Sequence, residues 1–247
     1  MRQLSFWSLK MIEALILCGG KGERLNEITK GVIPKTMVQV NKKPFLYYII
    51  NQLKHWEIRN LILLVGYKKE LIIDYFGDGK KFGVNIKYSI ENNPMGTGGA
   101  IKLAENLIQG KKFFLLNGDT FLDINFQGFL KFQIENNADV AIAVKFLENS
   151  NRYGIVKFNR NKIISFSEKS NLKSSFVNLG IYIFEKSLLL DVALKPSSLE
   201  RDLLPYFVSE KNVFGYMCNG YFIDIGIPND FKKANKEFIA NYGYSFS

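Results

Sequence analysis

The stretch Ala14-Leu15-Ile16-Leu17-Cys18-Gly19-Gly20-Lys21-Gly22-Glu23-Arg24-Leu25 joins an apolar run to a glycine-rich loop. A short apolar run that stops at glycine is typical of a buried strand. Glycines let backbone N–H groups approach an anion closely, and consecutive N–H groups can form a nest for phosphate oxygens. The stretch therefore predicts a phosphate-binding loop after a strand. Arg24 adds a fork of donors to it, and Lys35 adds a point charge.

This loop differs from two better-known phosphate loops. A dinucleotide-binding fingerprint needs a glycine where Leu25 stands, and a P-loop needs Ser or Thr where Gly22 stands and Gly where Leu15 stands. Neither pattern fits. Taken by itself, the loop leaves an ordinary glycine-rich turn as an alternative.

The regions around the loop predict an α/β fold. In the first half of the chain, short apolar runs alternate with stretches of helical period, which indicates a Rossmann-like, mostly parallel mixed sheet flanked by helices. We expect strands at 14–18, 60–65, 85–89 and 112–116, and helices at 45–56, 69–76, 99–107 and 126–135.

From residue 140 onward the pattern changes to strands separated by short polar turns, which indicates a small antiparallel extension. We expect these strands at 140–145, 154–158, 162–167 and 177–184, followed by helices at 199–206 and 230–241. The chain has 247 residues, of which 47% are hydrophobic. Since it shows no linker or repeat, we expect one domain over 11–247, with 1–10 as an N-terminal extension before a second candidate start at Met11.

Polar residues follow other expected strands and form candidate sites. The turn Asn92–Ala100, with Gly96 and Thr97, could let a flat base lie against the backbone, or be an ordinary loop. Asn117-Gly118-Asp119 closes a strand at the edge where open α/β sheets bind ligands, and its carboxylate suits magnesium, or serves as a cap or turn. Asp224 interrupts an apolar run, which is costly for a charge that is neither paired nor bound to metal.

The second half carries short polar side chains on expected strands that could fix sugar hydroxyls. The candidates are Gly154, the pair Glu168-Lys169 and Asn178, although the pair could also be an exposed turn.

Composition limits the partners. The formal charge of +10 permits an anionic ligand, but Lys and Arg are scattered along the chain, which disfavours nucleic acid. No run approaches the roughly 18 to 20 apolar residues that span a bilayer, so we expect no membrane partner. Cys18 and Cys218 have no companions at disulfide or zinc spacing, which fits a reducing cytoplasm.

In this order the motifs resemble those of the sugar-phosphate nucleotidyltransferase family, also called nucleoside-diphosphate-sugar pyrophosphorylases. The resemblance covers about residues 11–238. The family's first signature is matched by Gly19, Gly20, Gly22, Arg24, Leu25, Pro34 and Lys35. Its base-binding turn is matched by Gly96 to Ala100, with Met95 in place of the usual Leu. Its metal-binding, sugar-binding and second metal motifs are matched by Gly118-Asp119, Glu168-Lys169 and Asp224.

The resemblance implies a role for each matched residue. Arg24, Lys35 and Asp119 would be catalytic, and Asp119 and Asp224 would hold Mg²⁺. The residues implied to bind the nucleotide are Leu17, Gly19, Gly20, Gly22, Arg24, Gly96, Thr97, Asn117 and Gly118, and those implied to bind the sugar are Gly154, Glu168, Lys169 and Asn178. The family's common β-helix domain is not expected, and the usual Pro-Leu-Thr and a second Pro are replaced by Asn26-Glu27-Ile28-Thr29 and Thr36.

The implied reaction joins a sugar 1-phosphate to a nucleoside triphosphate and releases pyrophosphate. GTP and D-glycero-α-D-manno-heptose 1-phosphate are the preferred substrates, with mannose 1-phosphate, or UTP and N-acetylmuramate 1-phosphate, as alternatives. We expect a cytoplasmic monomer or homodimer. Two other classes stay open: a GT-A glycosyltransferase using Asp119 and Asp123, and a non-catalytic sensor of sugar nucleotides.

Overall fold

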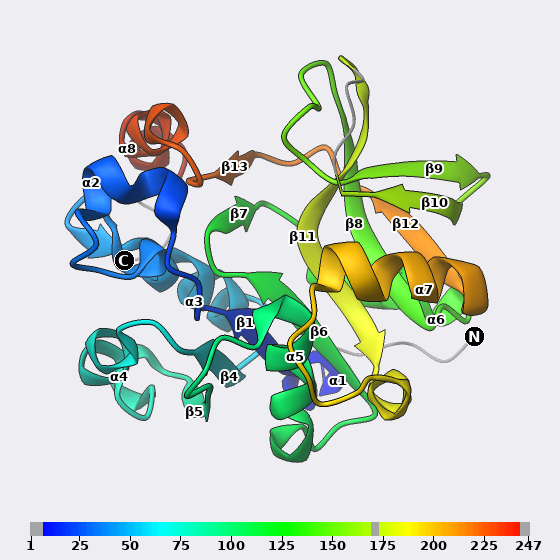
Figure 1. The fold of residues 1–247 in the computed structure, drawn as a ribbon, viewed down its shortest axis with the longest axis horizontal. Coiled ribbons are helices and arrows are strands. Elements are labelled where there is room, and N and C mark those ends of the chain that lie inside the picture. Colours follow the sequence, from blue (N-terminus) through cyan, green and yellow to red (C-terminus); the bar gives the residue numbers. More distant parts are fainter. Residues whose placement is uncertain (1–6, 169–172, 243–247) are drawn as a thin grey trace.

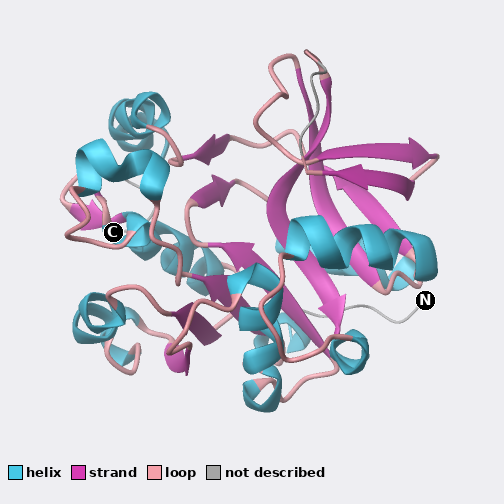
Figure 2. Cartoon of the chain, in the orientation of Figure 1, coloured by secondary structure: helices cyan, strands magenta, loops and turns pink. Residues whose placement is uncertain are grey.

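The computed structural model of the protein describes residues 7–168 and 173–242. A nine-stranded mixed sheet runs through it in the order β5-β4-β1-β6-β11-β8-β12-β10-β9, and Figure 2 shows its helices packed around these strands. The strands are β1 (Glu13–Leu17), β4 (Asn60–Val65), β5 (Asn85–Ile90), β6 (Lys112–Asn117), β8 (Val140–Leu147), β9 (Ile155–Asn159), β10 (Lys162–Ser167), β11 (Ser175–Glu185) and β12 (Val213–Met217).

The first half of the sheet is parallel, as the sequence predicts. β1 pairs in parallel with β4 on one side and with β6 on the other, and β4 pairs in parallel with β5. Because side chains alternate between the faces of a strand, Ala14 and Ile16 enter one core cluster while Leu15 enters another, and all are completely buried. β1 is therefore an interior strand, apolar on both faces.

Helices cover both faces of the sheet and account for the two core clusters. On one face lie α3 (Phe45–His55), α4 (Lys69–Phe76), α6 (Phe126–Glu135) and α8 (Pro228–Tyr242). On the other lie α5 (Gly96–Leu103) and α7 (Leu204–Glu210), which stand in front of the sheet in Figure 1. The predicted bounds of α4 and α6 are confirmed, whereas α5 begins at Gly96 rather than at Gly99.

The second half of the sheet closes on itself. β11 runs antiparallel to β6 and β8, β8 pairs in parallel with β12, and β10 joins β12 to β9. β9 then returns to β11 through Phe176 opposite Val156 and Val177 opposite Ile155. Five strands thus form a closed ring at one end of the molecule.

Several short elements complete the fold. Two of them, β7 (Thr120–Leu122) and β13 (Phe222–Asp224), pair antiparallel in a sheet of their own. The remaining strands are β2 (Gln39–Val40) and β3 (Lys43–Pro44), and the remaining α-helices are α1 (Trp7–Lys10) and α2 (Asn26–Thr29). No helix in the described ranges is long and apolar enough to cross a bilayer.

Leu9 and Lys10, which directly precede Met11, contact the rest of the domain. Leu9 in α1 is completely buried in the same cluster as Ala14, and Lys10 lies 3.5 Å from the carboxylate of Glu57. Met11 itself is 76% exposed. The segment directly before Met11 therefore packs against the domain.

We predict that Leu9→Ala lowers the free energy of unfolding by about 2–5 kcal/mol, because it leaves a cavity in the core. Met11→Ala is the matched control and should change it by less than about 0.5 kcal/mol. Urea denaturation of both variants measures the difference. Equal stability of the two variants would show that α1 contributes nothing to the fold.

Candidate active site

A cleft of about 1030 Å³ opens at the carboxyl ends of the parallel strands. Its walls are the segments that follow β1, β4, β5 and β6, together with Lys35 and the end of the segment between β11 and α7, where Glu200 and Arg201 lie. Parallel strands place these ends at a common edge, which is where ligands bind in open α/β sheets. The cleft therefore gathers motifs that are far apart in the sequence.

The loop after β1 forms one wall. Leu17, Gly19, Gly20, Gly22 and Arg24 all line the cleft, so the loop predicted to bind phosphate faces it. Gly22 has φ 68°, and a Cβ built on it would lie 2.8 Å from the Cβ of Lys35. Glycine is required here both for the left-handed backbone and for the close approach of the lysine stem.

The turn before α5 forms the facing wall and is held by hydrogen bonds from a distant segment. Gly96 has φ 67°, and a Cβ on it would lie 2.4 Å from the carbonyl oxygen of Ser197. The Ser197 amide donates to the carbonyl of Met95, and the Gly98 amide donates to the carbonyl of Ser197, both at 2.9 Å. The turn is therefore fixed before any ligand binds.

Glu200, which the sequence analysis missed, connects to the same turn. Thr97 donates its hydroxyl to this carboxylate at 3.0 Å, and the Leu199 amide donates to Thr97 at 2.7 Å. Burial raises the pKa of the Glu200 carboxyl, although hydrogen bonds from its own backbone, Thr97 and Ser198 act in the opposite direction. Nothing in the local pattern distinguished Glu200 from an exposed helical glutamate.

Arg201, the neighbour of Glu200, contacts one of the residues predicted to bind the sugar. It lines the cleft, and its guanidinium lies 3.5 Å from the carboxylate of Glu168. Asn178 and Gly154 are joined by a backbone hydrogen bond, in which the backbone N–H of Asn178 donates to the carbonyl of Gly154 at 2.8 Å. Glu168, Gly154 and Asn178 are not among the residues that line the cleft, and Lys169 lies outside the described residues. Their sugar-binding role stays a prediction.

The predicted metal ligands meet because β7 pairs with β13. Asp119 directly precedes β7, and the register places Asp224 opposite Thr120. Lys35 donates to Asp119 Oδ2, and its Nζ lies 3.9 Å from Asp224 Oδ1. Asn117 and Gly118, which precede Asp119, also line the cleft. One ammonium and two carboxylates thus share one corner of the site.

The pKa values of the two carboxyls are shifted in opposite directions. Burial disfavours the charge on Asp119, but the Lys35 ammonium and hydrogen bonds from Lys35 and Thr120 hold the pKa of that carboxyl below its usual value. Burial and then the charge of Asp119 raise the pKa of Asp224, which Lys35 partly opposes. The carboxyl that bonds to the lysine therefore ionises more readily than the other.

Asp119 and Asp224 fit a magnesium site in which the protein supplies only two carboxylates. Within the described ranges, no group of three or more His, Cys, Asp or Glu side chains could hold a metal ion by itself. Mg²⁺ usually takes one or two protein carboxylates and completes its shell with water and substrate phosphates. Asp119 and Asp224 supply those carboxylates, and water or the phosphates of a bound substrate would complete the shell.

The thiol of Cys18 lies at the cleft but is not poised for nucleophilic attack. Both Cys18 and Cys218 are free and buried. Burial raises the pKa of Cys18, which keeps the thiol protonated, and Asp119 adds to the shift. The lone His55 lies at the end of α3 and does not line the cleft. The site suits a direct displacement rather than a covalent enzyme intermediate.

The geometry disfavours the glycosyltransferase pairing of Asp119 with Asp123. These residues stand at opposite ends of β7, and Asp123 is exposed and does not line the cleft. Asp119 instead lies beside Asp224 and Lys35.

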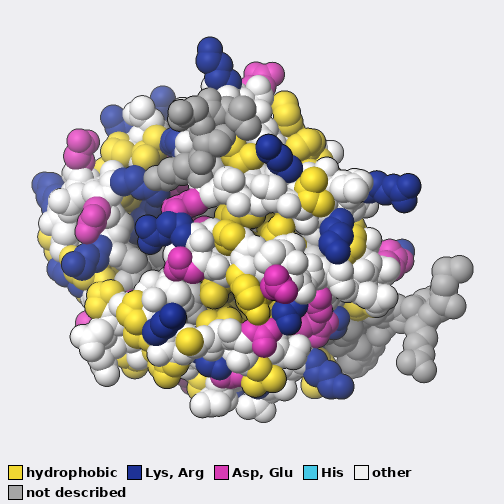
Figure 3. Space-filling model, turned by 45° about the vertical axis from the view of Figure 1, so that its right-hand side comes forward, with side chains coloured by type: hydrophobic (Ala, Val, Ile, Leu, Met, Phe, Trp, Pro, Cys, Tyr) yellow, Lys and Arg dark blue, Asp and Glu magenta, His cyan; other side chains and the backbone are white. Residues whose placement is uncertain are grey.

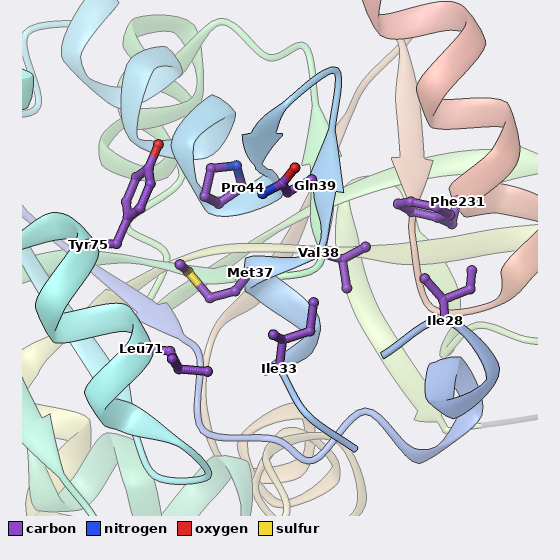
Figure 4. Close-up of a pocket in the computed structure, with 9 residues that line it drawn as sticks. All are labelled: Ile28, Ile33, Met37, Val38, Gln39, Pro44, Leu71, Tyr75 and Phe231. Atoms are coloured by element: carbon purple, nitrogen blue, oxygen red, sulfur yellow. The ribbon is translucent and has the colours of Figure 1, made fainter. Parts of the chain in front are cut away.

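A second hollow, of about 490 Å³, lies behind the loop that carries Lys35 (Figure 4). Leu71 and Tyr75 from α4, Phe231 from α8 and Ile28 from α2 give it a mainly apolar lining. Such a lining offers little to a phosphate. On the face drawn in Figure 3, Lys and Arg side chains are dispersed among acidic and apolar ones rather than gathered into one patch.

These observations define the class of protein. A glycine-rich phosphate loop, a second glycine turn and a lysine with two carboxylates converge at the carboxyl edge of a parallel sheet. The sequence matches the model of the nucleotidyl transferase family over residues 13–241. The chain belongs to this family, as the sequence motifs predicted.

Within this family, the chain is similar to guanylyltransferases along nearly their whole length. The chain is 38% identical to the D-glycero-alpha-D-manno-heptose 1-phosphate guanylyltransferase of Aneurinibacillus thermoaerophilus, covering 92% of this chain and 98% of that protein. It is 40% identical to the protein of the same name from Campylobacter jejuni, covering 89% and 97%. The crystal structure of HddC from Yersinia pseudotuberculosis complexed with GMP-PN matches with a TM-score of 0.83 at 34% identity, covering 92% of this chain and all of that one.

We predict that Gly96→Ala destabilises the protein by about 1–3 kcal/mol, since alanine is strained at φ 67° and its Cβ would meet Ser197. Gly20→Ala is the control, because a Cβ there meets nothing within 4 Å. Thermal unfolding of the ligand-free variants compares them. If Gly96→Ala melts together with the control, the turn is not held as described.

Proposed function

We propose that the protein joins GTP to D-glycero-α-D-manno-heptose 1-phosphate, giving GDP-heptose and pyrophosphate. The observation that carries this proposal is the convergence, in one cleft, of the phosphate loop, the second glycine turn, Lys35 and Asp119. Asp224 lies beside Lys35 at the same place. The similarity to guanylyltransferases along nearly their whole length supports the choice of substrates. A cytoplasmic location and a monomeric or dimeric state remain predictions.

In this reaction an oxygen of the sugar phosphate bonds to the α-phosphorus of GTP while the bond from that phosphorus to pyrophosphate breaks. Catalysis of such a transfer depends mainly on positioning and on stabilising charge. The amides of the loop after β1 and the guanidinium of Arg24 would hold the departing pyrophosphate. Lys35 would draw the phosphates of the two substrates together. Magnesium held by Asp119 and Asp224 would supply positive charge to the reacting phosphate.

Glu91 supports guanine as the base. It follows β5 and lines the cleft, and a Cβ on Gly66 or Gly19 would lie 2.5 or 2.8 Å from its Oε1. The Met95 amide donates to its other oxygen at 3.0 Å. An ionised carboxylate only accepts hydrogen bonds. Guanine presents two adjacent N–H donors on one edge, whereas uracil and thymine present one N–H between two carbonyl oxygens. A carboxylate at this wall therefore favours guanine.

The proposed reaction is tested by incubating the protein with magnesium, each of GTP, UTP, CTP, dTTP and ATP, and sugar 1-phosphates that include the heptose and mannose compounds. We expect pyrophosphate release that depends on GTP and the heptose phosphate together. Release with mannose 1-phosphate, or with UTP and N-acetylmuramate 1-phosphate, would keep the reaction class and correct the substrates. Absence of release with every pair, alongside tight binding of a nucleotide sugar, would favour the sensor.

We predict that Glu91→Gln lowers the ratio of kcat/KM for GTP to that for UTP by about 10- to 100-fold, the value of one hydrogen bond to a charged group. Glutamine keeps an acceptor for the Met95 amide but can also donate to a uracil carbonyl. Glu27→Gln, an exposed change in α2 outside the cleft, should leave the ratio as it is. An unchanged ratio in Glu91→Gln would remove Glu91 from base selection.

A further inference from the structure

The ammonium of Lys35 lies where the proposed metal ligands converge. It bonds to Asp119 and lies 3.9 Å from Asp224 Oδ1. The side chains of Lys35, Asp119 and Asp224 are only 11%, 29% and 19% exposed. Little solvent screens these charges, so the lysine is the nearby cation that lets both carboxylates lie inside the protein.

A divalent cation cannot share this place with the ammonium. Magnesium binds carboxylate oxygens at about 2.0–2.1 Å, closer than a hydrogen bond reaches, and demands a regular shell of six ligands. A cation bound to Asp119 Oδ2, the oxygen to which Lys35 donates, would lie close to the ammonium, and the two positive charges would repel each other. Binding of the metal therefore requires the lysine to withdraw.

Two glycines determine where the lysine can go. A Cβ on Gly226 would lie 3.1 Å from Lys35 Nζ, and a Cβ on Gly22 would lie 2.8 Å from Lys35 Cβ. The base of the side chain is thus held against the phosphate loop, while its tip faces the two carboxylates and the backbone of Gly226. Gly22, Gly226 and Lys35 all line the cleft. An ammonium that leaves the carboxylates therefore enters the space beside the phosphate loop.

We propose that Lys35 is the counter-ion of Asp119 and Asp224 in the free protein and that a divalent cation displaces it, which releases the ammonium toward the substrate phosphates. The inference rests on the proposed function, since it concerns the same site. When no nucleotide is bound, Lys35 competes with the metal for the two carboxylates. Because a phosphate offers the freed ammonium a new partner, metal and nucleotide each strengthen the binding of the other.

The first test measures Mn²⁺ affinity in the absence of nucleotide and sugar, by electron paramagnetic resonance of free Mn²⁺. Lys35→Met removes the competing charge and should bind Mn²⁺ at least about tenfold more tightly than the parent. Lys69→Met removes a positive charge from another wall of the same cleft, where Lys69 lies 3.8 Å from Glu70. It should stay within about twofold of the parent. Equal or weaker binding by Lys35→Met would overturn the proposal.

The second test uses the unaltered protein, because Lys35→Met leaves two enclosed carboxylates without their lysine and could fold poorly. Brief acetylation with acetic anhydride, read by mass spectrometry, reports how accessible each lysine is. Adding Mg²⁺ without nucleotide should increase labelling of Lys35 severalfold and leave Lys21 and Lys69 unchanged. Labelling of Lys35 that stays constant or falls would overturn the proposal. Pyrophosphate release by the same preparation reports the proposed function separately, so each can fail without the other.

Discussion

The parallel pairing of β1 with β4 and β6 is the constraint on which the rest of the site depends. β1 is apolar on both faces and is held in register by neighbours on both sides. Its register carries the loop after Leu17 to the same edge as Asn117, and the Gly118 amide donates to the carbonyl of Leu17 at 3.0 Å. The phosphate loop and the aspartate motif are thus positioned by hydrophobic burial within the sheet rather than by contacts with each other's side chains.

Besides the pairing of β6 with β11, small and specific contacts join the second half of the chain to this frame. The β7–β13 pair brings Asp224 to Asp119, and the segment around Ser197 and Glu200 holds the turn at Gly96. Arg201 in turn lies 3.5 Å from Glu168, which is predicted to bind the sugar. Residues 197–201 therefore connect the Gly96 turn with Glu168.

The sequence predicted the long, strongly patterned elements well, because burial on a regular face produces a regular pattern. The bounds of β4, α4, α6 and β10 agree with the prediction, and so does the convergence of the phosphate loop, the Gly96 turn and Asp119.

β7 was missed because it is only three residues long, and β12 because Gly215 interrupts its run to make room for Phe158. Glu91, Glu200 and Arg201 have functional positions only through contacts between distant segments, and no local pattern carries that information. The side chain of Asn178 bonds to the Tyr182 hydroxyl and the Gly180 amide, and its role in sugar binding stays a prediction.

The closed ring of β8, β12, β10, β9 and β11 has a consequence for how the molecule meets copies of itself. A strand at the edge of a sheet exposes unpaired backbone groups that can join another chain. Within the described nine-stranded sheet, closure leaves β5 as the one such edge, since β9 is paired on both sides. Lys87 is exposed on β5, and a charged edge side chain discourages that joining. The strand-rich half of the chain therefore contributes no open edge to the described nine-stranded sheet.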